Sequence, residues 1–524
     1  MPPSVRVVSA TESAARDRAT IEKGTPSRVL MQRAGEGAAS EISRRYSERL
    51  RDGAVIFTGP GNNGGDGWVV AGALARSGVK VTVIEAAEPK TPDAIAEKQA
   101  AAEAVESVEQ LNAHQGIESA TPGVVVDALL GTGGGGEPRG SIAAAIAAIN
   151  QLRAAGARVV ALDVPSGLDA TTGRHSDCVI ADTTFSFGGM KRGLLLARDC
   201  GGELVVLDIG LDEDVSKPMK GSAKQLSQLP LLVDGNWVQS RIPPIRYDAH
   251  KGTRKHLAVI GGGKGMAGAA VLATRSALRS GIGMLRAFVA RENKSDMLAA
   301  APSALISEWP TPGEISSMIS KWADAIVIGP GLGNSDETLK LVQILLRSTT
   351  QPVLLDADAL NVFDGDLAGI ATLLEGRQSL ITPHVAEFAR LAGVTVREVL
   401  DNSFDIGSDV ARTLDCTVLL KGSPTVIFTP VGDRYVVARG TAALGTGGSG
   451  DLLAGIAGTL LAQIGEAPAA GSCAAWIHGR AAELCGYVRG TTLEDILYAL
   501  PRAWNEPVEP LVPPVLAKLP AVAQ

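Results

Sequence analysis

Short apolar runs that end in an aspartate recur in the N-terminal part of the chain and strongly constrain how it can fold. They cover residues 124–127, 158–163 and 204–208, and helical or glycine-rich stretches separate them. Apolar runs of this length predict buried strands, and strands that alternate with helices favour a parallel sheet. We therefore expect an α/β domain with a Rossmann-like, doubly wound sheet and a ligand site at the carboxyl ends of its strands.

A second α/β series follows a polar, proline-containing break. Its apolar runs lie at 256–260, 325–329, 353–356, 380–382 and 416–420. Because the loops of the two series differ in chemistry, we expect two different domains rather than an internal duplication. The expected organisation is a first domain over 1–215, a linker over 216–245, a second α/β domain over 246–505 and a proline-rich, disordered tail over 506–524.

Composition limits which binding partners and which cellular compartment are expected for the chain. The net charge of −7 implies no basic surface for nucleic acid. The five cysteines are widely spaced and form no CxxC pair, which argues against a zinc site or a disulfide framework and favours a reducing compartment. Neither a secretory signal nor an apolar stretch of about 20 residues occurs, so we expect a cytoplasmic protein without membrane contact.

A glycine-rich loop follows the predicted strand 54–58. Its sequence GPGNNGGDG (59–67) formally matches GxGxxG, and Glu85 ends the next strand, as in a dinucleotide-binding dehydrogenase. The loop also contains two asparagines and an aspartate, where a simple pyrophosphate cradle has small neutral residues. Amide and carboxylate oxygens suit a hard cation as well as a ligand, so the pattern favours a different site.

This nonapeptide resembles the signature of the NAD(P)H-hydrate epimerases. The resemblance extends to LMQRAG (30–35), VDALLGTG (126–133) and LDVPSGL (162–168), and it covers roughly residues 1–215. One departure is Gln32, which stands where the family commonly has glutamate. It lies outside the expected contacts with the cation and the ring.

The resemblance implies roles for individual residues. Asp163 would contact the nicotinamide-derived ring and act as acid and base, while Asn63, Asp127 and Ser166 would bind a potassium ion. The other residues expected to contact the hydrate belong to two loops: Asn62, Asn63, Gly64, Gly65, Asp66, Gly131, Thr132, Gly133, Gly134, Gly135, Gly136 and Glu137. The structural alternative is that Asp127 and Asp163 only end strands and cap helices.

The chemistry of the hydrate agrees with a single acid–base group. Its C6 carries a hydroxyl next to the ring nitrogen, whose lone pair can expel that hydroxyl as the C–O bond breaks. Inversion at C6 then requires water to return to the opposite face. One carboxyl group that alternately gives and takes a proton is sufficient for both steps.

The strongest feature of the second domain is GTGGSGD (445–451), directly before an amphipathic helix. Successive glycines expose backbone N–H groups at a helix N-terminus, which favours binding of phosphoryl oxygens. Asp451 at the rim could take a proton from the group being phosphorylated. The alternative is an aspartate that caps a helix after a flexible loop. No Walker A sequence is present.

This combination resembles the ribokinase-like superfamily, and within it the ADP/ATP-dependent NAD(P)H-hydrate dehydratases. The resemblance covers about residues 245–500. The matching motifs are HKG (250–252), VIGG (259–262), GMAGAA (265–270), GPGLG (329–333), LDADALN (355–361), TPH (382–384) with Glu387, and LKGSPT (420–425). Family members have Pro-Gly where this chain has Val385 and Ala386, so we expect a turn of different shape at this position.

The resemblance again implies site residues. Those expected to bind the hydrate are Ala269, Gly331, His384 and Asp451, and those expected to hold the nucleotide are Lys421, Gly422, Ser423, Pro424, Thr425 and Gly450. Phosphorylation of the C6 hydroxyl would create a good leaving group, and loss of phosphate would regenerate the dihydropyridine. For His384 alone, a satisfied turn residue is the structural alternative.

The two resemblances together imply a bifunctional repair enzyme, an isomerase fused to a lyase. Its expected partners are hydrated NADH or NADPH, ADP or ATP as co-substrate, K⁺, Mg²⁺, and further copies of the chain in a homo-oligomer. Mg²⁺ is expected because phosphoryl transfer requires charge neutralisation. The alternative is a small-molecule kinase of the vitamin-precursor type with a non-catalytic N-terminal binding module.

Overall fold

The computed structural model divides the chain into two compact units. Unit 1 comprises residues 1–231 with 509–522, and unit 2 comprises residues 232–508. The described residues are 5–111, 121–134, 136–211, 229–505, 507 and 510–522. Much of the expected linker, residues 216–228, therefore lies outside the described residues. The remainder includes β10 (Leu231–Leu232) and α9 (Gly235–Arg241), so regular structure begins before residue 246.

Unit 1 contains an eight-stranded sheet in the order β20-β9-β7-β6-β5-β2-β3-β4. Its strands are parallel except β20, as expected for a doubly wound sheet. The strands are β2 (Ala54–Thr58), β3 (Val81–Glu85), β4 (Ser107–Gln110), β5 (Val124–Ala128), β6 (Arg158–Leu162), β7 (Thr183–Phe187), β9 (Glu203–Leu207) and β20 (Val515–Leu519). A separate parallel pair joins β1 (Val7–Val8) to β8 (Met190–Lys191).

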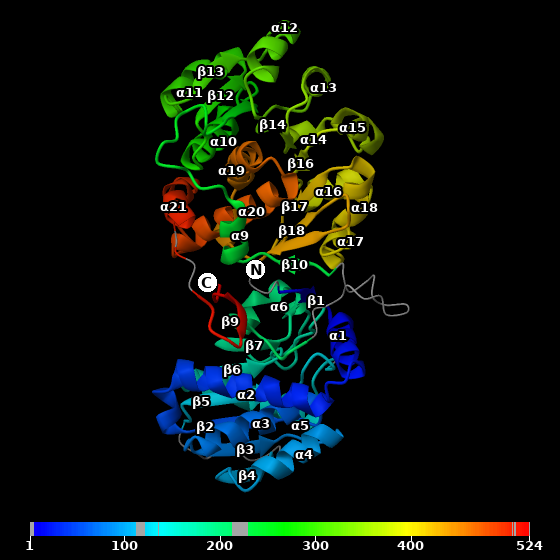
Figure 1. The fold of residues 1–524 in the computed structure, drawn as a ribbon, viewed down its shortest axis with the longest axis vertical. Helices are drawn as coiled ribbons and strands as arrows, with labels where there is room; N and C mark the ends of the chain where they lie inside the picture. Colours follow the sequence, from blue (N-terminus) through cyan, green and yellow to red (C-terminus); the bar gives the residue numbers. More distant parts are fainter. Residues whose placement is uncertain are drawn as a thin grey trace. The chain divides into compact units, whose positions relative to one another are not determined.

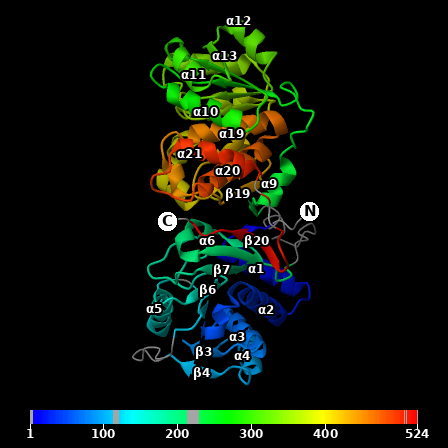
Figure 2. The same ribbon diagram turned by 90° about the vertical axis from the view of Figure 1, so that its left-hand side faces the viewer.

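Helices cover both faces of this sheet. Ile56 packs in one apolar cluster with α2 (Ser27–Tyr46) and α3 (Asn62–Arg76), whereas its neighbour Phe57 packs in another with α5 (Gly140–Ala154). Successive strand residues point to opposite faces, so these helices lie on opposite sides of the sheet (Figure 2). The other helices are α1 (Ala10–Glu22), η1 (Arg49–Asp52), α4 (Pro92–Ala101), α6 (Arg192–Leu196) and α7 (Arg198–Gly201).

Two sequence expectations for unit 1 differ from the structure. Helix α3 begins at Asn62, inside the segment expected to be a loop, because its glycines permit close approach: a Cβ on Gly65 would lie 2.6 Å from Met31 Sδ. The expectation of a disordered tail is wrong for β20, which pairs antiparallel with β9. Alternation explains this strand, since Ala517 and Leu519 are buried while Lys518 between them is not.

Unit 2 contains a ten-stranded sheet in the order β10-β19-β18-β17-β16-β15-β14-β11-β12-β13 (Figure 1). The pairs from β13 to β17 are parallel, and β18 and β19 continue antiparallel. The strands not yet given are β11 (His256–Ile260), β12 (Met284–Val289), β13 (Leu305–Glu308), β14 (Ala325–Ile328), β15 (Val353–Leu355), β16 (Ser379–Ile381), β17 (Thr417–Leu420), β18 (Thr425–Phe428) and β19 (Arg434–Val437).

The main core of unit 2 lies between one face of this sheet and four helices, α10 (Ala267–Arg279), α19 (Ser449–Ile464), α20 (Ala467–Leu484) and α21 (Leu493–Asn505). Ile427 belongs to this core, whereas Phe428 contacts α18 (Gly407–Leu414) on the opposite face. The remaining helices are η2 (Arg291–Asn293), α11 (Lys294–Ala300), α12 (Pro312–Glu314), η3 (Ile315–Ser320), α13 (Asp336–Ser348), α14 (Asp358–Asn361), α15 (Leu367–Leu374), α16 (Val385–Ala392), α17 (Val396–Asp401) and η4 (Ala442–Gly445).

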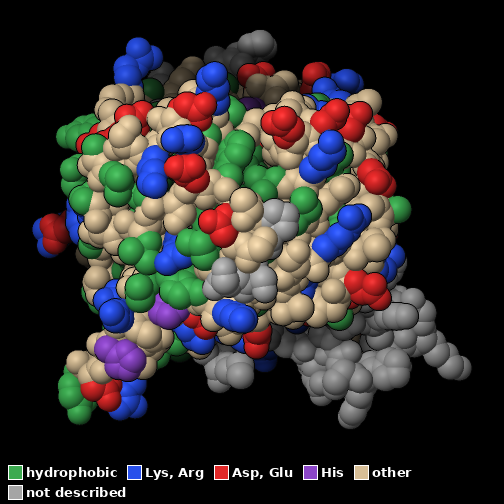
Figure 3. All heavy atoms as spheres, turned by 90° about the horizontal axis from the view of Figure 1, so that it is seen from above, with side chains coloured by type: hydrophobic (Ala, Val, Ile, Leu, Met, Phe, Trp, Pro, Cys, Tyr) green, Lys and Arg blue, Asp and Glu red, His purple; other side chains and the backbone are tan. Residues whose placement is uncertain are grey.

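The structure confirms the expected fold class, two α/β units built on predominantly parallel sheets. On the face seen in Figure 3, acidic and basic side chains are interspersed. Among the described residues, no helix is both long and apolar enough to cross a bilayer.

Candidate active sites

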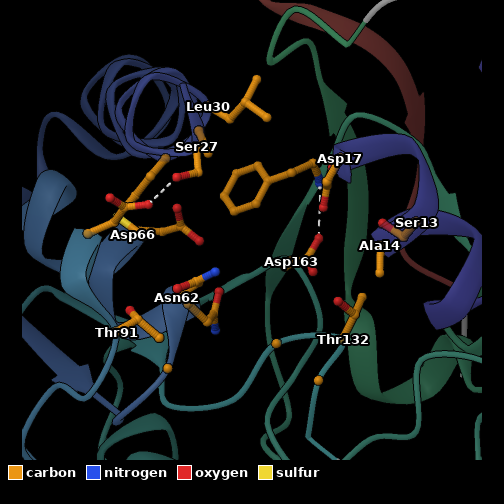
Figure 4. Close-up of a pocket in the computed structure, with 18 of the residues that line it drawn as sticks. Ser13, Ala14, Asp17, Ser27, Leu30, Asn62, Asp66, Thr91, Thr132 and Asp163 are labelled. Atoms are coloured by element: carbon orange, nitrogen blue, oxygen red, sulfur yellow. Dashed lines mark hydrogen bonds between the residues drawn. The ribbon is translucent and has the colours of Figure 1, made fainter. Parts of the chain in front are cut away.

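A cavity of about 550 Å³ opens in unit 1 where the expected epimerase motifs meet. Side chains of Asn62 and Asp66, from α3, line one side, and Asp163 at the end of β6 lies on the other (Figure 4). The predicted residues that line the cavity are Asn62, Asn63, Asp66, Gly131, Thr132, Gly133, Gly134 and Asp163. Separate loops at the carboxyl ends of the strands thus converge on one site, as in other doubly wound sheets.

Asp163 is held in place by a buried lysine that the sequence did not single out. Lys191 Nζ lies 2.5 Å from Asp163 Oδ1 and also donates to the Phe187 carbonyl at 2.7 Å, with its side chain only 1% exposed. Asp163 itself has a φ of 65°, a strained backbone conformation that is uncommon outside glycine and often found at functional sites. This arrangement places a proton donor, the Lys191 ammonium, within hydrogen-bond distance of the Asp163 carboxylate.

Two further carboxyl groups, those of Asp66 and Asp17, interact electrostatically with Asp163 and Lys191. Burial raises the pKa of Asp66 well above its ordinary value, and the charges of Asp163 and Asp17 raise it further. Burial also raises the pKa of Asp17, which lies on α1, while Lys191 opposes that shift. Both shifts favour the protonated form of the carboxyl group more than in a free aspartate, next to the ion pair of Asp163 and Lys191. Asp17 and Lys191 were missed because neither belongs to a recognisable motif.

The three residues predicted to bind potassium are linked by hydrogen bonds at the edge of the cavity, where Asn63 and Ser166 both donate to the Leu130 carbonyl. Asp127 accepts hydrogen bonds from Ser166 Oγ at 2.6 Å and from the Ser166 N–H at 2.8 Å. Asn63 Nδ2 donates to the Leu130 carbonyl at 3.0 Å, and its buried Oδ1 has no hydrogen-bond partner. Burial raises the pKa of Asp127 to about 6, despite the hydrogen bonds that lower it. The unpartnered amide oxygen of Asn63 and the buried carboxylate of Asp127 are ligand types that suit a hard cation.

The remaining described residues predicted to contact the hydrate do not line the cavity of about 550 Å³. Gly136 and Glu137 line a second cavity of about 430 Å³, and Gly135 lies outside the described residues. Gly64 and Gly65 line neither of these two cavities and instead allow close packing: a Cβ on Gly64 would lie 2.1 Å from the Gly59 carbonyl oxygen.

The departure at position 32 also lies away from the cavity lining. Gln32 Nε2 donates to Glu97 Oε1 at 2.9 Å and does not line the cavity. The substitution therefore leaves the cavity wall unchanged.

In unit 2 the glycine-rich loop leads directly into α19, with Gly448 at its N-cap at a φ of 95°. Asp451 lies in the first turn of the helix. Burial raises the pKa of Asp451 to about 7; the charge of Asp356 adds to this shift and Lys421 opposes it. A carboxyl group that titrates near neutrality is well matched to general-base catalysis.

Lys421 connects this aspartate with two further carboxylates. Its Nζ donates to Asp356 Oδ1 at 2.9 Å and lies 3.8 Å from Glu387 Oε2. A Cβ on Gly450 would lie only 3.3 Å from the same Nζ, so Gly450 allows the helix N-terminus to approach the ammonium closely. Asp356 and Glu387 belong to motifs quoted above, but the sequence did not assign them to the site.

His384 has a clear structural role. It is the N-cap of α16, and its Nδ1 accepts from the N–H groups of Ala386 and Glu387 at 3.1 and 3.2 Å. The altered turn therefore still starts a capped helix. The side chain remains 54% exposed, so it can also contact a ligand.

The other predicted residues of unit 2 form two groups, one around Ala269 of α10 and one between β17 and β18. Gly331 adopts a φ of 61°, and a Cβ there would lie 2.9 Å from Ala269 Cβ, so these two residues are neighbours. The expected nucleotide-binding residues directly follow β17: Lys421, Gly422, Ser423 and Pro424 lie between the two strands, and Thr425 is the first residue of β18. Within this turn Thr425 Oγ1 donates to the Gly422 carbonyl at 3.2 Å.

Two family models match the chain. The model described as NAD(P)H-hydrate dehydratase matches residues 257–502, and that described as YjeF-related protein N-terminus matches residues 27–193. The bifunctional NAD(P)H-hydrate repair enzyme of Escherichia coli (strain K12) is 35% identical, over 91% of this chain and 90% of its own. That of Moorella thermoacetica is 34% identical, over 97% and 98%. The chain belongs to the bifunctional NAD(P)H-hydrate repair enzymes.

A solved structure is also similar to part of this repair enzyme. It is the ADP/ATP-dependent NAD(P)H-hydrate dehydratase from Bacillus subtilis co-crystallized with ATP and Mg²⁺, which is 28% identical and covers 51% of this chain and 95% of its own, with a TM-score of 0.45. The family assignment confirms the predicted bifunctional repair enzyme, and it does not favour the alternative of a vitamin-precursor kinase.

Proposed function

We propose that unit 1 interconverts the R and S hydrates of NADH and NADPH and that unit 2 dehydrates the S form. The dehydration would consume ADP, giving AMP and phosphate, or ATP, giving ADP and phosphate. The observation that supports this proposal is the presence of a candidate site in each unit of a chain that belongs to this family. Asp163 with Lys191 lies in one, and Asp451 with the glycine-rich loop lies in the other.

In unit 1, the ring nitrogen of the bound hydrate expels the C6 hydroxyl as Asp163 delivers to it a proton that Lys191 has passed to this carboxylate. Water then returns to the opposite face, and the same carboxylate accepts the proton. Lys191 keeps the carboxylate oriented and stabilises its ionised form between the two steps. Loop 131–134 and the Asn62 and Asp66 side chains line the cavity around the substrate.

A potassium ion fits the pocket formed by Asn63, Asp127 and Ser166. The unpartnered Oδ1 of Asn63 and the carboxylate of Asp127 would be ligands, and the Ser166 hydroxyl would complete the set. When bound, the ion would supply a fixed positive charge next to loop 129–131. Its effect would be to hold this loop, which forms one wall of the substrate cavity.

In unit 2, Asp451 accepts the proton of the C6 hydroxyl while this hydroxyl attacks the terminal phosphoryl group. Backbone N–H groups of residues 447–450 and the Lys421 ammonium stabilise the charge that develops on the phosphoryl oxygens. The ring nitrogen then expels phosphate and NADH or NADPH is restored. The carboxylates near Asp451 are suitable to hold Mg²⁺ with the nucleotide, and the ion would neutralise phosphate charge.

One assay tests both halves. The purified chain is incubated with a mixture of the two hydrate epimers and ADP or ATP, and the absorbance of reduced nicotinamide is followed. We expect complete recovery with K⁺ present and slower consumption of the R form when Na⁺ replaces K⁺. Release of a stable phosphorylated hydrate without recovery of NADH would contradict the dehydratase assignment. A cytoplasmic location and a homo-oligomeric state remain predictions from the sequence.

A further inference from the structure

Two cysteines and a histidine come together in unit 1 outside the substrate cavity. Cys178 Sγ lies 3.1 Å from Cys200 Sγ, and Cys200 Sγ lies 3.4 Å from His175 Nε2. All three potential ligand atoms lie within 4.8 Å of one another. The sequence argued against a zinc site because it lacks a CxxC pair. In the fold, α7, which carries Cys200, lies against the segment that precedes β7, so cysteines that are far apart in the sequence come together.

We propose that His175, Cys178 and Cys200 bind a zinc ion, with water in the fourth coordination position. Zinc bonds of about 2.3 Å to sulfur and about 2.0 Å to nitrogen place two tetrahedral sulfurs about 3.8 Å apart, and a sulfur and a nitrogen about 3.5 Å apart. The distance between Cys200 and His175 already fits. The two sulfurs need to separate by less than about 1 Å.

Burial divides the site into a shielded half and an open half. Cys178 and Cys200 are only 5% and 1% exposed, whereas His175 is exposed. The ion can therefore enter from the side of the imidazole while the thiols remain protected from solvent. His175 also lines the second cavity of about 430 Å³, next to Ser176. A water ligand in the fourth position would face this side.

The surroundings of Cys178 indicate what the ion would do. Its carbonyl accepts from Asn150 Nδ2 at 3.0 Å, and the next residue, Val179, donates its N–H to the Ser166 carbonyl at 2.9 Å. A Cβ on Gly167 would lie 3.0 Å from Cys178 Cα. The cysteine is thus fixed against the loop that carries Ser166.

His175 and Cys178 both lie in a connection without regular secondary structure. Residues 163–182 contain no helix or strand. An ion bound to all three side chains would tie this long connection to α7. The ion would fix the wall of the second cavity beside the potassium-binding residues, and its water position would leave it open to an exchangeable ligand, as in zinc sites with three protein ligands.

Zinc itself is the probe that tests the site. The untagged full chain is prepared under reducing conditions, stripped with a chelator and titrated with zinc at buffered nanomolar concentrations. We expect one ion per chain and a higher melting temperature for unit 1 with zinc present. Replacement by Co²⁺ should give the ligand-field and thiolate charge-transfer bands of a tetrahedral sulfur-containing site.

Matched variants assign the ligands. Loss of a group that only supports a ligand already weakens metal binding by about 10–100-fold, so His175→Ala and Cys200→Ser should each weaken it by at least about 100-fold. His175 is exposed, so its variant should fold without zinc as the parent does. Cys485→Ser serves as the control, because this half-buried cysteine lies in unit 2. It should bind zinc normally.

Three results would overturn the proposal. One is the absence of stoichiometric zinc binding by the reduced chain. Another is unchanged zinc affinity in His175→Ala or Cys200→Ser. The third is a Cys178–Cys200 disulfide in protein kept under reductant, since that bond would consume both thiolates.

Discussion

At the scale of single residues, two carboxyl groups have surroundings that suit different chemistry. Asp163 has a buried ammonium at 2.5 Å, so its ionised form has a permanent partner. Asp451 lies among Asp356, Asp358 and Glu387, and burial with these charges raises its pKa to about 7. Asp163 can therefore exchange a proton with the Lys191 ammonium. Asp451 can accept one at neutral pH.

Asp163→Asn should slow epimerisation by about 10²–10⁴-fold, because an amide cannot cycle a proton. Asparagine tolerates the positive φ of this position, so the backbone should not change. The measurement is the rate at which the R hydrate disappears in the presence of excess unit 2 activity. Dehydration of the S hydrate by the same variant is the internal control and should be unchanged. Undiminished epimerisation would leave Asp163 with a structural role only.

Asp451→Asn should slow dehydration by about 10²–10⁴-fold while nucleotide still binds, because backbone N–H groups provide most of the expected phosphate contacts. Nucleotide affinity is measured by calorimetry beside the rate of NADH recovery. Epimerase activity, which belongs to unit 1, should be unaffected. Joint loss of affinity and turnover would instead indicate a damaged loop or a metal-binding role for this carboxylate.

The pH dependence of dehydration follows from the raised pKa of Asp451. A base must be ionised to act, so kcat/KM should increase as pH rises through about 7 and decrease below it. Lys421 lowers this pKa, so Lys421→Gln should move the inflection to higher pH even though it also reduces activity. A profile that falls with rising pH in this range, or an inflection that does not move in the variant, would exclude Asp451 as the base.

At the scale of helices and strands, local patterns predicted the elements that carry the sites. Asp127 is the last residue but one of β5, Asp163 directly follows β6, and the glycine-rich loop leads into helix α19 as expected. The sequence could not identify Lys191, because its pairing with Asp163 depends on the position of β8 in the fold. The same limit applies to β20, whose partner strand lies more than 300 residues earlier.

Strand β20 offers a test of this distant pairing. Ala517→Asp places a charge at a position that is 1% exposed, and it should lower the stability of unit 1 by about 2 kcal/mol or more. Lys518→Gln, at the neighbouring partly exposed position, should change it by less than about 0.5 kcal/mol. The measurement is the midpoint of thermal inactivation of the epimerase. Equal midpoints for the two variants would show that β20 contributes little to unit 1.

At the scale of the whole molecule, each unit contains its own sheet, apolar core and candidate site. The chain leaves unit 1 near residue 231 and returns to it at residue 509, so unit 2 is a continuous segment whereas unit 1 is built from two. Truncation should therefore affect the units differently. A piece that ends at residue 231 lacks β20 and exposes the edge of β9, which should reduce its stability.

A fragment over residues 229–508 should fold and dehydrate only the S hydrate, because it contains the complete ten-stranded sheet and the residues around Asp451. With a mixture of epimers and ADP, recovery of NADH should stop when the S form is exhausted, while the full chain continues to completion. Addition of the Asp451→Asn full chain should restart recovery, because this variant retains the epimerase unit. Addition of full chain carrying both Asp163→Asn and Asp451→Asn is the matched control and should not restart it. Consumption of both epimers by the fragment alone at the rate of the full chain would place epimerisation outside unit 1.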